Sequence, residues 1–476
     1  MRTIKLLATG LLLASANATY ADSPRPVPLT RPEMKQLLED MKSRKPRIPL
    51  PELSAEEKEK LGERGAGYES RIRALYLPAG EGFGFGGNRP ASAGNAQTPA
   101  NPRTQPGQFG RNTDPNQSLD YAFKTELFWI VSRTNNCQYC LGHQESKLLA
   151  AGLKEDEIAA LDGDWSEFTP AQRAAFAFAR KLTFEPYNLS DADIASLRKD
   201  YTDLQILEMI MSVAGNNAIN RWKEGAGVPQ SANGGNFGRR TEPTTEQNAA
   251  HQSYLTPTAE KYLSRITKVA PVVNDPTSGK PTVLTVCDRP PLEPRAEVEK
   301  ALQVARTRGP RLPLLDEAKA ETVLSEALPS GDLPQWARLL ANFPREGVRL
   351  ATGIRNADEK GDLTPLLKAQ VSWIIARQDR AWYATGQAKR RLESLGLSAD
   401  QIYSLDGDLS SFTPSDRALF VVARKLAASP VVLTDEDVAL AVKLAGPRDT
   451  VQLINYTTNR ASFDRITEAA GLQVEK

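Results

Sequence analysis

The residues of this chain that can do chemistry gather in one short stretch. The chain has three cysteines and two histidines in 476 residues, and Cys137, Cys140 and His143 form a Cys-x-x-Cys-x-x-His motif. Asn135 or Asn136 is suited to cap a helix, and Cys137 then lies in its first turn, where the helix dipole favours a thiolate. Residues three apart on a helix can touch. The motif therefore combines a nucleophilic sulfur, a resolving sulfur and a proton carrier.

The spacing of this motif fits some kinds of site better than others. A structural zinc ion usually takes four ligands, whereas the motif offers three, and His251 and Cys287 are distant in the sequence. Covalent haem needs a histidine directly after the second cysteine, where Leu141 stands. A centre that cycles between dithiol and disulfide fits the spacing, requires no metal or other cofactor, and uses His143 as a proton shuttle. The alternative is a fixed structural disulfide, or a pair of buried thiols, with a surface histidine.

Composition limits the partners of the protein. The formal net charge is +2, from 60 Lys+Arg and 58 Asp+Glu, so no global field attracts nucleic acid. No stretch approaches the roughly 20 apolar residues that a membrane span requires. The sequence therefore indicates neither a nucleic-acid partner nor a membrane span, and its length predicts about two or three domains.

The first 21 residues have the pattern of an export signal. Arg2 and Lys5 provide a charged start, an apolar run extends from Leu6 to Ala14, and Thr19-Tyr20-Ala21 is a small-residue cleavage pattern. We therefore expect export to the periplasm or the extracellular space, where the cysteine pair can form a disulfide. The third cysteine, Cys287, is expected to be a buried, unreactive thiol.

Helical patterns dominate the sequence, so the predicted fold class is all-α. Capping boxes at Ser54 and Thr202, and a Thr-Pro start at Thr169, mark helix beginnings. Helices are expected at 54–75, 121–133, 137–151, 170–182, 191–200 and 203–224. The segment near 80–118 is rich in Gly, Pro, Asn and Gln, and we predict a disordered insert there. The predicted organisation is a signal peptide at 1–21, a first domain at 22–229, a linker at 230–290 and a second domain at 291–476.

The second predicted domain repeats the first. Ile130-Val131-Ser132-Arg133 matches Ile374-Ile375-Ala376-Arg377, and Phe168-Thr169-Pro170 matches Phe412-Thr413-Pro414, at a constant offset of 244 (374 − 130 and 414 − 170). Upstream, the run around Arg47 resembles the run around Arg311 at an offset of 264. The reactive groups are lost in the repeat: at the offset of 244, Cys137, Cys140, His143 and Glu126 become Ala381, Ala384, Gln387 and Gln370. We predict a shared scaffold with a site in the first domain alone.

The residues around the motif also have the pattern of a known family: Glu126-Leu127, Val131-Ser132-Arg133, Asn136-Cys137-Gln138-Tyr139-Cys140, His143 and Ala151-Gly152-Leu153. This pattern resembles the carboxymuconolactone decarboxylase and alkylhydroperoxidase D-like family over about residues 121–229, and residues 366–472 resemble a copy without the motif. The resemblance implies two all-helical domains in tandem and assembly into trimers or hexamers. Redox members of the family reduce peroxides with two cysteines, without metal or haem.

By the same resemblance, Cys140 corresponds to the peroxidatic cysteine and Cys137 to its resolving partner. His143 and Glu126 correspond to residues that relay protons to the pair. Members that act as decarboxylases lack the paired cysteines, so decarboxylation is not expected here.

Two positions depart from the family pattern. The family histidine usually lies four residues after the second cysteine, where this chain has Gln144, and the glutamate twelve before the first cysteine, where it has Thr125. A long helix also ends in polar residues at a place where the family often carries Asn and Arg: Asn216, Asn217, Asn220 and Arg221. These four belong either to the site or to polar caps and surface contacts.

The sequence thus predicts an exported thiol-dependent peroxidase or a related antioxidant disulfide reductase. Its substrate is expected to be a peroxide or a small oxidised molecule, and its electron donor a thiol reductant. Because each chain replaces two subunits, we expect a homo-oligomer in which three chains make a ring of six domains. The alternative is a non-catalytic tandem-domain assembly protein in which Cys137 and Cys140 form a structural disulfide.

Overall fold

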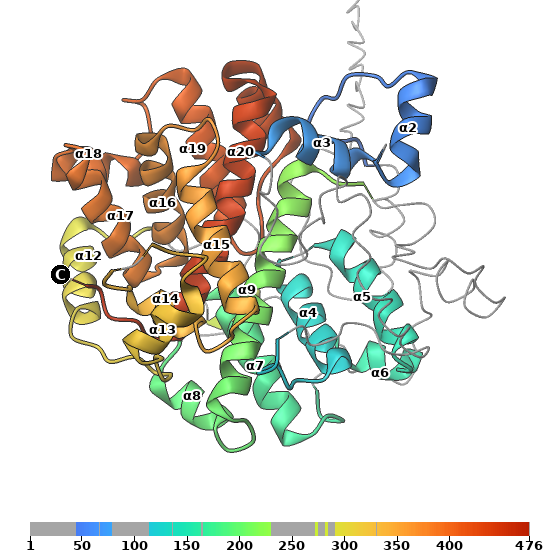
Figure 1. Cartoon of the computed structure of the whole chain (residues 1–476), viewed down its shortest axis with the longest axis vertical. Coiled ribbons are helices and arrows are strands. Elements are labelled where there is room, and N and C mark those ends of the chain that lie inside the picture. The colour runs from blue at the N-terminus through green and yellow to red at the C-terminus, as the bar shows by residue number, and fades with distance from the viewer. Residues whose placement is uncertain are drawn as a thin grey trace, which may run out of the picture.

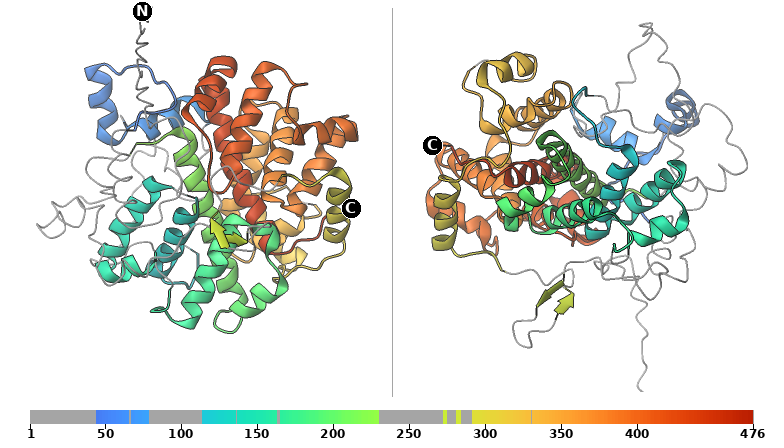
Figure 2. Two further views of the ribbon diagram at one scale, coloured as in Figure 1. Left: turned by 180° about the vertical axis from the view of Figure 1, so that it is seen from behind. Right: turned by 90° about the horizontal axis from the view of Figure 1, so that it is seen from below.

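The protein is helical throughout most of the part that the structure describes. The computed structural model describes residues 44–65, 67–78, 114–135, 137–162, 165–229, 272–274, 281–283, 291–329 and 331–475. The predicted signal peptide, most of the predicted insert, His251 and Cys287 lie outside these residues. The predicted all-α class is confirmed. One antiparallel pair, β1 (Val272–Asn274) and β2 (Pro281–Val283), lies within the predicted linker and outside the helical body in the right-hand view of Figure 2.

The described helices fall before and after this linker, and we call the two groups the N-terminal part and the C-terminal part. The N-terminal part contains α2 (Ala55–Gly65), α3 (Tyr68–Tyr76), α4 (Tyr121–Asn135), α5 (Gln138–Ala150), α6 (Glu155–Ala160), α7 (Pro170–Phe184), η2 (Pro186–Asn188), α8 (Asp191–Leu197) and α9 (Asp203–Ala226). The C-terminal part contains α12 (Arg295–Ala305), α13 (Glu317–Leu324), α14 (Gln335–Leu340), α15 (Glu346–Glu359), α16 (Pro365–Asp379), α17 (Trp382–Ser394), α18 (Ala399–Tyr403), η3 (Ser404–Asp406), α19 (Pro414–Ala427) and α20 (Asp435–Ala469). None of the described helices is long and apolar enough to cross a membrane.

Side-chain caps begin the helices where the sequence predicts them. Thr169 Oγ1 accepts from the backbone N–H of Gln172 at 3.2 Å, and Thr202 Oγ1 accepts from that of Gln205 at 3.3 Å. Each hydroxyl satisfies an N–H group that has no partner within its helix. The predicted starts of α7 and α9 are therefore confirmed.

The prediction of one helix over residues 54–75 is wrong. The capping box of Ser54 and Glu57 forms, but α2 ends at Gly65 and α3 begins at Tyr68. Gly62 within α2 already adopts a φ of 65°, which glycine reaches without steric cost. Glycines clustered in this run outweigh the apolar spacing that favoured a continuous helix.

Helix bounds in the two parts recur at the offset of 244. Helices α4 and α16 begin at residues 121 and 365 and end at 135 and 379, and α5 and α17 begin at 138 and 382. Helices α8 and α9 correspond to the single helix α20, which is interrupted at Gly446, where φ is 86°. The pattern agrees with the repeat in the sequence, and the proposed domain boundaries stay a prediction.

Helices α9 and α20 run side by side through the centre of the protein, with α4–α6 on one side and α16–α19 on the other (Figure 1). The buried side chains form two large clusters, and each cluster combines residues of both parts. Cys137 and Cys140 belong to the cluster dominated by the C-terminal part, whereas Ala381 and Ala384 belong to the one with most of the N-terminal core. The buried cluster that contains the cysteine pair therefore extends into the C-terminal part.

Two arginines before the repeated core join the parts reciprocally. Each guanidinium donates to carbonyls of both parts, Arg47 to Glu224 and Leu433 at 2.6 and 3.1 Å, and Arg311 to Glu468 and Leu189 at 2.8 and 2.9 Å. The carbonyls are related by the offset of 244, since 468 − 224 and 433 − 189 are equal. This contact explains why the runs around Arg47 and Arg311 resemble each other.

Candidate functional site

The two cysteines of the motif lie at the start of α5 as free thiols. Cys137 is itself the N-cap and Cys140 is the third residue of the helix, so the prediction of Cys137 in the first turn is wrong by one position. The backbone of α4 continues to Asn135, so Asn135 does not cap α5. The two Sγ atoms are 2.9 Å apart, longer than the roughly 2.05 Å of a disulfide bond. The sulfurs are therefore close enough that two-electron oxidation and a small displacement would join them as a disulfide.

Burial determines the protonation state of Cys137, the first thiol of the pair. Cys137 is fully buried and Cys140 is 4% exposed. Burial raises the pKa of Cys137 well above its ordinary value, and its hydrogen bond to Cys140 and the nearby carboxylate of Glu224 act in the same direction. Cys137 is therefore held as the protonated thiol.

His143 lies one turn after Tyr139 on α5, and their ring centroids are 4.5 Å apart. Burial and the positive charges of Lys223 and Lys147 lower the pKa of His143 to about 3. The imidazole is thus neutral near pH 7 and a weak proton acceptor. The side chain of the predicted proton shuttle packs against Tyr139, and its low proton affinity is poorly matched to proton transfer near pH 7.

Glu126 is placed on α4 against α7, where its carboxylate accepts from Gln172 at 3.3 Å. Burial, opposed by Gln172, and then the charges of Asp120 and Glu157 raise the pKa of Glu126 to about 7. Such a value suits proton transfer. The contacts that the structure gives Glu126 do not include the cysteines or His143, so its role as a relay stays a prediction.

A lysine and a glutamate that the sequence analysis missed lie beside the motif. The Nζ atom of Lys223 on α9 is 4.2 Å from the centroid of the Tyr139 ring. Its ion-pair partner is Glu69 on α3, which also accepts from Trp222 Nε1 at 2.7 Å and from Arg73 at 3.1 Å. Burial alone would raise the pKa of Glu69, but Lys223 and Arg73 outweigh it and hold that pKa at about 2. One signal was available in the sequence, since Lys223 becomes Thr467 at the offset of 244.

The glutamine at the family's histidine position faces a buried polar group on α4 and α9. Gln144 Nε2 donates to Ser132 Oγ at 2.9 Å, and Ser132 Oγ also accepts from Asn216 and Asn220, both at 3.1 Å. Asn135 closes the group by donating to Asn220 Oδ1 at 3.1 Å. The asparagines of α9 are thus buried contacts that hold α4, α5 and α9 together, and the alternative of surface polar groups is wrong.

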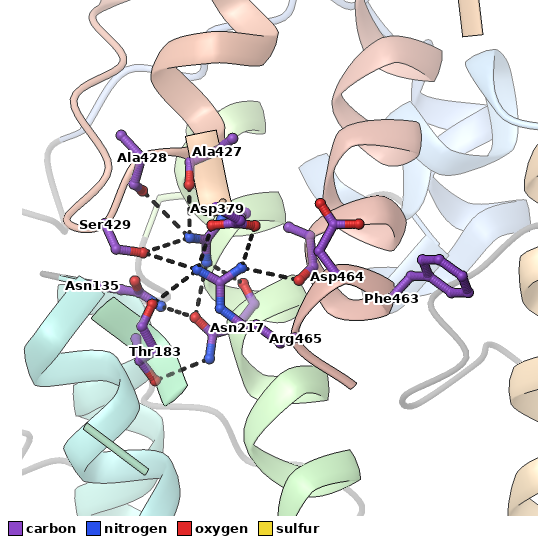
Figure 3. Close-up of polar contacts among 12 residues, drawn as sticks. Asn135, Thr183, Asn217, Asp379, Ala427, Ala428, Ser429, Phe463, Asp464 and Arg465 are labelled. Carbon is purple, nitrogen blue, oxygen red and sulfur yellow. Dashed lines mark hydrogen bonds and ion pairs between the residues drawn. The ribbon is translucent and has the colours of Figure 1, made fainter. Parts of the chain in front are cut away.

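Arg221 and its counterpart Arg465 extend this polar group across the two parts. Arg221 donates to Asn217 Oδ1 at 3.0 Å and to the carbonyl of Ala427 at 3.0 Å. Arg465 pairs with Asp379 at 2.7 Å and donates to the carbonyl of Thr183 at 2.9 Å, as Figure 3 shows. The two acceptor residues, Thr183 and Ala427, are again 244 positions apart, so the two arginine contacts correspond to each other.

Two aspartates that recur in the repeat have structural partners. Asp162 and Asp406 each accept from a buried tryptophan at 2.9 and 2.8 Å and pair with an arginine at 3.0 and 2.9 Å, the partners being Trp129 and Arg133, and Trp373 and Arg377. These contacts give Asp162 and Asp406 the same structural role in the two parts. Among the described residues, no group of three or more His, Cys, Asp or Glu side chains is arranged to hold a metal ion.

Comparison with known proteins finds a family match at the cysteine motif. Residues 129–181 match the Carboxymuconolactone decarboxylase family, which confirms the resemblance over the segment that carries the cysteines. The chain is also similar to the crystal structure of a cysteine-to-alanine variant of a debrominase in complex with 2,3,4-tribromopyrrole, with 14% identity and a TM-score of 0.29, over 39% of this chain and 90% of that chain. A search of curated proteins finds no match.

Proposed function

We propose that this protein is a thiol-dependent peroxidase, or a related disulfide reductase, that works through Cys137 and Cys140. The observation that carries the proposal is the pair of free thiols 2.9 Å apart at the start of α5, within a segment that matches a family with redox members. A helix N-terminus favours a thiolate at its first turn, which is where Cys140 lies.

The proposed reaction balances as follows. The Cys140 thiolate attacks the distal oxygen of a peroxide, the O–O bond breaks, and the alkoxide leaves and takes up a proton as an alcohol. The sulfenic acid formed on Cys140 is attacked by the Cys137 sulfur, and the S–S bond forms with release of water. An external thiol reductant then exchanges with the disulfide and restores both thiols. One peroxide is reduced for each pair of electrons that the reductant supplies.

The proposal also concerns the relation between the N-terminal and C-terminal parts and the assembly of the chains. They are proposed to be copies of one helical unit, with the second copy lacking the site, because their helix bounds and reciprocal arginine contacts recur at the offset of 244. Such a chain stands for two subunits, and three chains are proposed to assemble into a ring. Light scattering of the purified protein tests the assembly, and a monomer at all concentrations contradicts it.

Export to the periplasm or the extracellular space is proposed from the composition of residues 1–21. Mass determination of the mature N-terminus tests it, with Asp22 expected as the first residue. A full-length protein that stays in the cytoplasm contradicts it.

The decisive experiment measures peroxide consumption with a dithiol reductant by wild type and by Cys137→Ser, Cys140→Ser and Cys287→Ser. We expect Cys140→Ser to abolish turnover and Cys137→Ser to permit one oxidation without rapid turnover. Cys287→Ser should leave turnover unchanged and is the matched control. Equal consumption by all four proteins contradicts the proposal.

The second candidate is a non-catalytic assembly protein with a fixed Cys137–Cys140 disulfide. The observation in its favour is the reciprocal contact of Arg221 and Arg465 across the two parts, which makes the chain resemble a fused dimer. A redox titration separates the candidates. A potential below about −300 mV belongs with structural disulfides, and a higher potential belongs with a cycling centre.

A further inference from the structure

Three residues on one face of α20 hold buried polar atoms that have no hydrogen-bond partner in the described part of the chain. Thr457, Arg460 and Asp464 follow one another at intervals of three and four, so they lie on successive turns of the helix. The hydroxyl of Thr457, Nε of Arg460 and both carboxyl oxygens of Asp464 lack a partner. Thr457 is fully buried, Arg460 is 7% exposed and Asp464 is 1% exposed. Unpaired buried polar groups cost free energy, so three of them on one face call for a role other than stability.

The guanidinium of Arg460 forms no ion pair with the described residues, although two carboxyl groups interact with it electrostatically. One of them, Asp358 on α15, pairs with Arg391 at 2.8 Å instead. The other, Asp464, lies one turn later on α20 and makes no hydrogen bond. The guanidinium carbon of Arg460 lies 4.2 Å from the centroid of the Phe463 ring, which supports it from one side. A buried cation is therefore held in place without an anion bound to it.

The carboxyl group of Asp464 is suited to donate a hydrogen bond. Burial raises the pKa of Asp464 well above its ordinary value, Asp379 acts in the same direction, and Arg460 opposes both. Asp379 is itself held in the ion pair with Arg465. A carboxyl group that keeps its proton has one O–H donor as well as an acceptor oxygen. This face of α20 therefore offers a cation and two O–H groups.

The N-terminal part has a different set of side chains at the corresponding positions. At the offset of 244, the counterparts of Thr457, Arg460 and Asp464 are Val213, Asn216 and Asn220. Both asparagines donate to Ser132 Oγ at 3.1 Å, and Ala376 stands at the position of Ser132 in the C-terminal part. The C-terminal part has thus lost the shared hydroxyl and carries an arginine and an aspartate in place of the two amides. A change that served packing alone would have replaced the amides with apolar residues.

We propose that Thr457, Arg460 and Asp464 form a binding site for a small monovalent carboxylate in the C-terminal part. The guanidinium of Arg460 pairs with the carboxylate oxygens, and the O–H groups of Asp464 and Thr457 donate to the same ligand. One guanidinium without an ion pair matches a single negative charge. The low exposure of the three residues restricts the ligand to a small molecule. This inference goes beyond the proposed function, because the site lies in the part that lacks the cysteines and involves no redox step.

Titration calorimetry of the full chain with acetate, propionate and benzoate, at constant ionic strength in chloride, tests the site. We expect saturable binding of at least one of these carboxylates with one site per chain. The neutral amides acetamide, propionamide and benzamide should not bind, because they lack the charge. Arg460→Met should weaken carboxylate binding about tenfold or more, since it removes the charged hydrogen bonds. Arg448→Met is the matched control: it removes an arginine of the same helix that pairs with Asp362 at 3.5 Å, and it should leave binding unchanged.

A second variant keeps the test decisive if Arg460→Met does not fold. The double variant Arg460→Asn with Asp464→Asn copies Asn216 and Asn220 of the N-terminal part, and it removes both the cation and the acid. It should fold and should not bind the carboxylates. Urea unfolding without ligand verifies that each titrated variant is folded.

Binding of a carboxylate by wild type that is lost in Arg460→Met, or in the double variant, supports the inference whether or not the protein consumes peroxide. Wild type that binds none of the three carboxylates overturns it, as does equal binding by wild type and the variants. Inorganic phosphate is titrated in parallel, and a preference for phosphate over all three carboxylates overturns the assignment of a monovalent carboxylate.

Discussion

Arg221 and Arg465 approach the same hydroxyl, that of Ser429, at 2.6 and 3.2 Å. Each guanidinium donates to a carbonyl of the other part. The two arginines differ in their side-chain partners, which are a carboxamide for Arg221 and a carboxylate for Arg465. Arg221 has the neutral Asn217 as its side-chain partner in the N-terminal part, whereas Arg465 forms a buried ion pair with Asp379. The two sites are thus similar in position and unequal in energy.

Arg465→Ala should destabilise the protein more than Arg221→Ala. Removing Arg465 leaves Asp379 as a buried charge without its partner, which costs about 3–5 kcal/mol, whereas removing Arg221 leaves neutral acceptors and costs about 1–3 kcal/mol. Urea unfolding of both variants measures the difference. Lys300→Ala, which breaks an exposed ion pair with Glu297 at 4.0 Å, should change stability by less than about 1 kcal/mol. An equal loss in both arginine variants contradicts the prediction.

Glu126→Gln should make the protein more stable above pH 7. The folded-state pKa of about 7 exceeds the usual value of 4.5, so the folded protein binds the proton more tightly than the unfolded chain does. The contribution of Glu126 to the free energy of unfolding is complete below about pH 4.5 and is lost as the pH rises to about 7. This loss amounts to about 3 kcal/mol. The variant copies Gln370 of the C-terminal part.

Urea unfolding at several pH values checks this, and an unchanged pH dependence contradicts it. Peroxide turnover by the same variant tests the relay. Because no contact joins Glu126 to the cysteines in the described structure, we expect turnover to persist.

Local signals in the sequence predicted the elements and the cysteine pair. Capping residues at Thr169 and Thr202 act within one turn, so they can be recognised without knowing the fold. The repeat separated residues of the scaffold, such as Asp162, from those of the site. Cys137 and Cys140 are close because they are three positions apart at the start of a helix, which the spacing in the sequence alone specifies.

The same local signals could not predict the contacts between segments that are distant in the sequence. Lys223 and Glu69 are 154 residues apart, and only the packing of α3 on α9 brings them together. The burial of Asn216 and Asn220 likewise depends on α4 and α5 covering that face of α9. The proton affinity of His143 depends on burial and on Lys223, which no local pattern in the sequence reveals.

His143→Gln should reduce the loss of stability in mild acid. The folded-state pKa of His143 is about 3, below the usual 6.5, so the unfolded chain binds the proton more readily. Stability from the neutral imidazole is complete above pH 6.5 and falls by about 1.4 kcal/mol per pH unit as the pH drops toward 3. The variant lacks this term, so its advantage over wild type should grow from pH 6.5 downward.

Nuclear magnetic resonance gives an independent check, because the chain has two histidines. The resonance that disappears in His143→Gln should not titrate between pH 7 and 5 in wild type. A midpoint near 6.5 for that resonance contradicts the prediction.

Glu69→Gln should destabilise the protein near neutral pH and much less in acid. Lys223 and Arg73 outweigh the effect of burial and hold the pKa of Glu69 at about 2, so its stabilisation is complete above pH 4.5 and is lost as pH falls toward 2. The full term is about 3 kcal/mol. Trp222 can still donate to the glutamine carbonyl, so the loss reflects mainly the ion pair. Urea unfolding at pH 7 and pH 3 measures the difference, with the exposed Glu59→Gln on α2 as control. A loss of equal size at both pH values would show that α3 is held by packing rather than by the charge of Glu69.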